Sequence, residues 1–216
     1  MTSEQAVAKQ SWWKTALSYL GLRRREKPVV ADAAALADFV HTRAAHVAQT
    51  TLYGYLRARA GVRFPEMFSN DEFVVSINQA KWNIWLACVS DLTVFAGLLM
   101  LRQTGVSDFR PALIETVDGI LARQGVPDDA GPAFADLAER VRQRIRLCDW
   151  LAYSDDEGPF VESPEALVRW APIIDELKQL DNEIVRNSMR FRWNETRKEL
   201  ARTLDIPAFL ASTRAA

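Results

Sequence analysis

Apolar residues along the chain recur at intervals of three and four positions, which is the spacing of one face of an α-helix. Strict alternation of apolar and polar residues, typical of a half-buried strand, is scarce. Glycine, proline and capping residues divide the helical pattern into segments that cover residues 4–20, 32–60, 69–104, 109–124, 127–153 and 163–204. The pattern therefore predicts an all-α fold, an elongated bundle of about five to six helices with an apolar central helix and a separate N-terminal amphipathic helix.

Several helix ends carry specific signals in the sequence. Asp32 is expected to cap the N-terminus of the second helix, which should end at Gly61. Ser69 and Glu72 fit a capping box at the start of the third helix, with Ser69 as the cap. Pro172 is expected to break the last segment into a short helix and a long one.

The stretch from 82 to 101 is the most apolar part of the chain and is long enough to span a bilayer. Asp91 lies at its centre, and Asn83 and Ser90 add further polar groups. A carboxylate at that depth costs about 2.5–3.5 kcal/mol on insertion scales, which favours a core helix over a membrane-spanning one. Because the helix is apolar nearly all round from 84 to 101, we expect other helices to surround it.

An ionised carboxylate in so apolar a helix needs either a charged partner or a raised pKa. The interpretation that we favour for Asp91 is a buried ion pair that fixes the register of the helix. Its expected partner is an arginine such as Arg57, Arg144 or Arg190.

A second interpretation places Asp91 in a pocket, as a general base or a ligand contact. The candidate lining residues are Asp91, Trp82, Trp85 and Tyr53. A cavity beside the carboxylate would favour this interpretation, and a sealed ion pair would favour the first.

The composition excludes some classes of protein. A chain of 216 residues with 49% hydrophobic content is large enough for one substantial core. Its 27 basic residues nearly balance 28 acidic ones, so neither nucleic-acid binding nor disorder is indicated globally. Cys88 and Cys148 both fall within apolar helical patterns, and we interpret them as reduced core residues of a cytoplasmic protein.

The residues needed for common catalytic chemistry are not grouped in this sequence. His41 and His46 lie five positions apart on one helix, about 140° apart around its axis, so they do not share a face. The chain has no phosphate loop, no Gly-x-Gly-x-x-Gly and no Cys-x-x-Cys. We therefore predict no catalytic residues, no metal site and no cofactor.

Basic and aromatic residues crowd the final helix, where we expect a docking surface for a protein partner. The candidate docking residues are Arg186, Arg190, Trp193 and Arg197. Glutamates lie among them at spacings that permit pairs within the helix, which argues against a nucleic-acid site. A further alternative is dimerisation through exposed aromatics of this helix, and the sequence leaves the oligomeric state open.

The first helix combines an aromatic face with a basic cluster. Residues 1–30 contain six basic and two acidic side chains, a net charge of +4, and are expected to form a helix and a basic linker ahead of a bundle domain over residues 31–206. Tryptophan settles at headgroup depth and basic residues attract anionic lipid, so the segment is typical of an interfacial helix. The candidate membrane contacts are Trp12, Trp13, Leu17, Leu20, Arg23, Arg24 and Arg25. The alternative is that this helix folds back and covers an apolar groove.

The stretch FVHTRAAHVAQTTLYGYLRARAGVRFPEMF, followed by FVVSINQAKWNIWLACVSDLTVFA, resembles an uncharacterised family of small alphaproteobacterial helical proteins, some of them labelled esterases. The resemblance covers roughly residues 36 to 100 and implies no catalytic residues. The chain lacks the Gly-x-Ser-x-Gly motif of esterases with the common hydrolase fold, so we do not predict esterase activity.

The function predicted from the sequence is a non-enzymatic helical interaction or adaptor protein. We expect it to be cytoplasmic and peripheral on the inner membrane through its N-terminal helix. The alternative is an enzyme of hydrolase type, or a carrier of a hydrophobic ligand, with a pocket beside Asp91.

Overall fold

The computed structural model describes residues 29–105 and 108–215, and these residues form helices joined by short connections. The α-helices are α2 (Ala33–Ala60), α3 (Asp71–Thr104), α4 (Arg110–Gln124), α5 (Phe134–Leu147), α6 (Glu162–Trp170), α7 (Asp175–Thr203) and α8 (Ile206–Ala215). Short 3-10 turns follow α2 at Gly61–Arg63 and Pro65–Ser69, and another follows α5 at Trp150–Ala152. The predicted all-α fold is confirmed.

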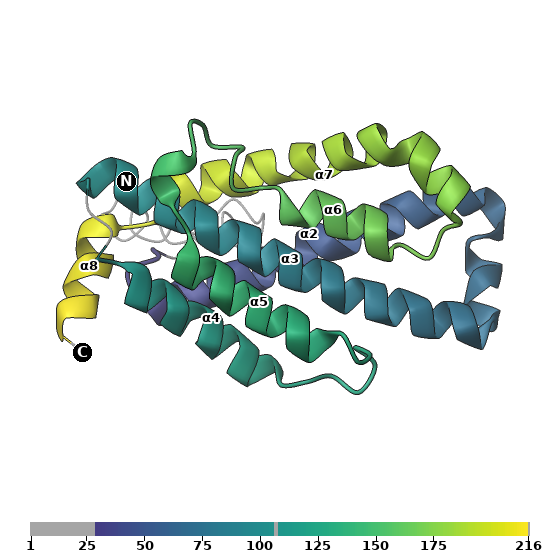
Figure 1. The fold of residues 1–216 in the computed structure, drawn as a ribbon, viewed down its shortest axis with the longest axis horizontal. Coiled ribbons are helices and arrows are strands. Elements are labelled where there is room, and N and C mark those ends of the chain that lie inside the picture. Colours follow the sequence, from purple (N-terminus) through teal and green to yellow (C-terminus); the bar gives the residue numbers. More distant parts are fainter. Residues whose placement is uncertain (1–28, 106–107, 216) are drawn as a thin grey trace, which may run out of the picture.

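The bundle is elongated, and α3 is its central helix (Figure 1). This helix contacts α2, α4, α5, α6 and α7, while α6 lies between α3 and α7 (Figure 1). It is long and apolar enough to cross a membrane, but 83% of its most apolar window is buried by its neighbours. The expectation of an apolar core helix surrounded by others is confirmed, and the buried faces of the surrounding helices complete one hydrophobic core.

The N-terminal cap of α3 differs from the predicted one. Asn70, and not Ser69, caps this helix: its Oδ1 accepts a hydrogen bond of 2.9 Å from the amide of Phe73. Ser69 belongs to the preceding 3-10 turn, and its hydroxyl donates to the carbonyl of Glu66. Because that turn holds Ser69 in a helical conformation, the first residue with the extended backbone of a cap is Asn70.

The predicted extent of α5, residues 127–153, is wrong at both ends. Its start is delayed because Gly131 adopts a positive φ of 75°, which interrupts the helix before Phe134. Its end lies at Leu147, where the side chain of Arg110 donates hydrogen bonds to carbonyls that no longer have a helical partner. Arg110 donates to the carbonyls of Ile145, Arg146 and Cys148 at 2.7, 2.8 and 2.9 Å.

The break between α6 and α7 at Pro172 is confirmed, but the chain continues beyond the predicted last helix. The side chain of Asp205 caps α8 by accepting from the amide of Ala208 at 3.0 Å, and Phe209 of α8 is fully buried. At the same junction, the amide of Val30 donates to the carbonyl of Thr203 at 2.8 Å. Val30, expected to end the linker, is 2% exposed and is therefore part of the bundle.

Close packing of Trp150 against α3 depends on a glycine. The indole nitrogen of Trp150 donates to the carbonyl of Val94 at 2.8 Å, across the backbone of Gly97. A Cβ atom at Gly97 would overlap the indole ring, whereas a Cβ atom at Gly54 of α2 would have no neighbour within 4 Å. Both glycines lie in helix interiors, but Gly97 has no room for a side chain, whereas Gly54 has.

We predict that Gly97→Ala destabilises the protein by about 1–3 kcal/mol, because the indole and α3 must separate. The matched Gly54→Ala substitution should stabilise it by about 0.5–1 kcal/mol, because it only raises helix propensity. Urea denaturation followed by circular dichroism measures both changes. Equal changes in the two variants would contradict the close contact.

Candidate functional site

The carboxylate of Asp91 is completely buried and bonded to two helices outside its own. Its Oδ1 accepts from Nη1 of Arg144 at 2.6 Å, which forms an ion pair between α3 and α5. Its Oδ1 and Oδ2 also accept from the backbone amides of Glu162 and Ser163 at 3.2 and 2.8 Å. These are the first amides of α6, so Asp91 caps a helix that lies far away in the sequence.

Arg144 links this carboxylate to the loop before α6. Its guanidinium donates to Ser90 Oγ at 2.9 Å and to the carbonyl of Pro159 at 2.7 Å, and it pairs with Glu162 at 3.0 Å. Burial raises the pKa of Asp91, although the charge of Arg144 and the hydrogen bond from Ser163 act in the opposite direction. Burial alone would lower the pKa of Arg144, but the two neighbouring carboxylates outweigh it and raise that pKa.

The four residues that the sequence places around one pocket have different partners in the structure, although the rings of Trp82 and Trp85 contact each other edge to face at 5.8 Å. The hydrogen bonds of Asp91 go to α5 and α6, whereas Trp85 contacts His41 of α2 edge to face at 5.6 Å. Trp82 donates to Asp129 Oδ1 at 2.6 Å, ahead of α5, and Tyr53 is half-buried against the core on α2. The two pockets described below are lined by other residues.

One of the docking residues expected on the surface of α7 lies in the core instead. Trp193 is fully buried, and its indole donates to Ser163 Oγ at 3.0 Å, so it packs α7 onto α6 and is not part of a surface. Arg197 is only 14% exposed and pairs with Glu157 at 3.1 Å. Arg186 pairs with Glu165 of α6, and Arg190 lies on the exposed side of the helix.

Three large apolar side chains lie on the outer side of α7 instead. Leu180, Ile184 and Phe191 are 76%, 73% and 74% exposed, and their spacing of four and seven residues places them on one face. We call these three residues the outer stripe. The opposite face of α7 carries Val185 and Met189, which are buried. The heptad spacing was visible in the sequence, but it gave no sign of which face would lack neighbours.

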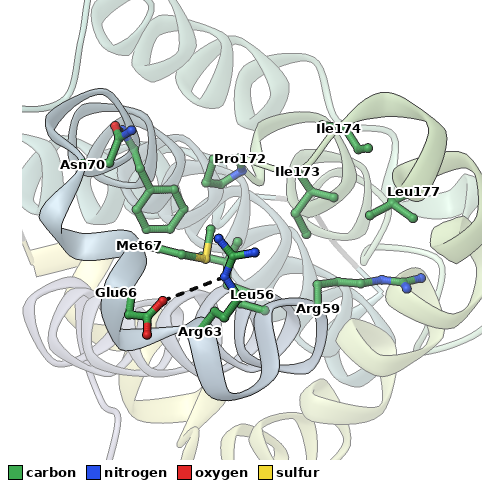
Figure 2. Close-up of a pocket in the computed structure, with 12 residues that line it drawn as sticks. Leu56, Arg59, Arg63, Glu66, Met67, Asn70, Pro172, Ile173, Ile174 and Leu177 are labelled. Atoms are coloured by element: carbon green, nitrogen blue, oxygen red, sulfur yellow. Dashed lines mark hydrogen bonds and ion pairs between the residues drawn. The ribbon is translucent and has the colours of Figure 1, made fainter.

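A pocket of about 630 Å³ opens at the end of the bundle where α2 and the break before α7 meet (Figure 2). Its lining is mainly apolar and comes from both sides of the opening, with Leu56, Met67 and Phe73 facing Pro172, Ile173 and Leu177. Two arginines lie at its rim. Arg59 forms an ion pair with Asp181. Arg63 lies 3.8 Å from Glu66, and Figure 2 shows this pair as a dashed line.

Other predicted site residues are outside the region that the structure describes. The candidate membrane contacts Trp12, Trp13, Leu17, Leu20, Arg23, Arg24 and Arg25 all precede residue 29. Within residues 29–105 and 108–215, no group of three or more His, Cys, Asp or Glu side chains is placed to hold a metal ion.

No protein-family model, curated protein or solved structure matches this chain. The resemblance over roughly residues 36 to 100 therefore stays a prediction from the sequence.

We predict that Asp91→Leu destabilises the protein by about 3–5 kcal/mol, because it leaves the Arg144 charge and the first amides of α6 without an acceptor. Arg144→Met should cost a similar amount, and the double variant should cost less than the sum of the two. Chemical denaturation of the four proteins measures this coupling.

A matched control for this pair is the exposed ion pair of Arg123 and Asp38, whose side chains are 55% and 71% exposed. Asp38→Ala should change stability by less than about 1 kcal/mol. Additive losses in the Asp91 and Arg144 variants would contradict the assigned pair.

Proposed function

We propose that this protein is a non-enzymatic helical interaction protein whose docking surface is the outer face of α7. The observation that carries the proposal is the outer stripe, three large apolar side chains each exposed by more than 70% on one helix face. Apolar side chains that lie singly on a surface need no explanation, but an aligned group of them marks a binding site. An amphipathic partner helix is the element that covers such a stripe.

The partner that fits this face is a second copy of the same helix. In an antiparallel pair, the two-fold axis crosses α7 at the level of residues 185 and 186. Leu180 then meets Phe191 of the partner subunit. Ile184 then meets Asn187 of the partner subunit. The three apolar residues of each copy are thereby covered, and the polar Asn187 at the centre favours one register over others.

The charges beside the outer stripe are complementary in the same arrangement. Glu183 and Arg190 are both exposed and flank the stripe on one side. The antiparallel register brings Glu183 next to Arg190 of the partner subunit, and the two-fold axis makes this pair twice. In a parallel pair Glu183 would instead face Ser188 of the partner subunit, so we favour the antiparallel dimer.

We predict that the full-length protein is a dimer at high micromolar concentration and that Ile184→Glu makes it a monomer, because a charge would be buried in the interface. Sedimentation velocity measures the change. The control is Val62→Glu, since Val62 is 94% exposed but lies outside α7, and it should leave the dimer intact. A monomeric wild-type protein would contradict the self-association.

Charge reversal tests the register. Glu183→Arg alone should weaken the dimer about tenfold, because two attractive pairs become repulsive. The double variant E183R/R190E should restore the wild-type affinity in the antiparallel dimer. Failure of the double variant to restore it would rule out that register, while the effect of Ile184→Glu would still test the surface itself.

The N-terminal segment supports a second part of the proposal, peripheral attachment to an anionic membrane surface on the cytoplasmic side. Its net charge of +4 and its paired tryptophans favour such a surface. Both cysteines of the chain are free thiols, as expected in a reducing compartment.

We predict that full-length protein co-sediments with anionic liposomes and that a variant without residues 1–27 does not, because each basic residue adds about 1 kcal/mol near anionic lipid. Neutral phosphatidylcholine vesicles serve as the control and should bind at most weakly. Equal sedimentation of the two proteins with anionic vesicles would exclude this segment as the anchor.

A further inference from the structure

A small pocket of about 230 Å³ lies between α3, α5 and α6, on the side of the bundle where Asp91 and Arg144 meet. Its walls are apolar and its rim is charged. Its lining includes Asn83, Leu86, Arg140, Glu162, Glu165 and Arg169. The pocket is distinct from the outer stripe, which lies on the opposite face of α7 from α6.

Asn83 is among the residues that line this pocket, and its side chain carries an amide. The residue is only 2% exposed, and within the part of the chain that the structure describes neither Oδ1 nor Nδ2 has a hydrogen-bond partner. Buried polar groups in native proteins are nearly always paired with protein, water or ligand. An amide offers both donors and an acceptor, so its partner must accept and donate hydrogen bonds.

The free charge at the rim is positive. Glu162 is paired with Arg144 at 3.0 Å, and Glu165 is paired with Arg186 at 3.2 Å. Arg140 is exposed and has no carboxylate within ion-pair distance among residues 29–105 and 108–215. Arg169 lies over the ring of Trp170 at 5.4 Å, outside any ion pair described for these residues.

The remaining walls would hold a short branched hydrocarbon. They consist of Leu86 and Ala87 from α3, Leu137 and Val141 from α5, and Ala166 and Trp170 from α6. The volume is below the roughly 300–1,000 Å³ of pockets for drug-sized ligands, so the ligand is about the size of an amino acid.

We propose that this pocket binds a small organic carboxylate that carries a branched apolar group and a hydroxyl or amide. The carboxylate lies at Arg140 and Arg169, because a guanidinium binds the two carboxylate oxygens as a fork. The hydroxyl or amide of the ligand pairs with Asn83, and the branched group fills the apolar walls.

Isothermal titration calorimetry of the full-length protein tests this inference with three probes. N-acetylleucine and leucic acid (the hydroxy-acid analogue of leucine) carry the required groups, and isocaproamide has a similar apolar body without a carboxylate. At least one of the two carboxylates should bind saturably at millimolar affinity or better, and isocaproamide should bind at least about tenfold more weakly. Binding of neither carboxylate, or equal binding of isocaproamide, would overturn the proposal.

Two variants locate the site. Arg140→Gln should weaken the carboxylate at least about tenfold. Asn83→Leu should abolish binding and at the same time raise the melting temperature, because an apolar side chain of similar size replaces an unpartnered amide. Arg146→Gln, on the same helix and paired with Glu139, is the control and should bind as wild type. Wild-type affinity in both pocket variants would overturn the assignment.

Discussion

The structure depends on one charged group, the carboxylate of Asp91, which is completely buried within the most apolar helix. A carboxylate in such a place is tolerated only where donors surround it, because removing it from water is costly. Here the donors come from Arg144 and from the first amides of α6, so satisfying one side chain fixes α3, α5 and α6 relative to one another. The requirement therefore sets the position of α6, a helix too short to be stable alone.

The position of α6 in turn determines which face of α7 is buried and which is exposed. Ser163, whose amide binds Asp91, also accepts a hydrogen bond from the buried indole of Trp193, and that contact turns one face of α7 inward. Because one face of the helix is held against α6, the residues half a turn away face solvent, and these include the outer stripe. The same short helix supplies one wall of the pocket at Asn83. Both proposed sites thus rest on the position of α6.

The C-terminal ends of α2, α3 and α4, which carry local signals, agree with the sequence prediction. α2, α3 and α4 end at Gly61, Gly105 and Gly125, each with a positive φ, where a glycine residue after a helical pattern already marks the end. The predicted end of α5 was wrong, because the helix ends where Arg110, from another helix, donates hydrogen bonds to its free carbonyls. Such a cap has no local pattern, since its donor is more than thirty residues away in the chain. The candidate sites show the same difference between what local sequence predicts and what distant parts of the chain decide. The sequence predicted that Asp91 would pair with an arginine, but three arginines were equally suitable.

The sequence by itself determined the helical fold, the central position of the apolar helix and the need for a cation beside its carboxylate. Those properties follow from hydrophobic periodicity and from the cost of an unpaired buried charge, which are readable without coordinates. Only the tertiary structure selected Arg144, buried Trp193 while leaving Phe191 exposed, and left the amide of Asn83 without a partner. The physical reason is that periodicity defines the faces of a helix, whereas the neighbours that cover a face come from distant parts of the chain.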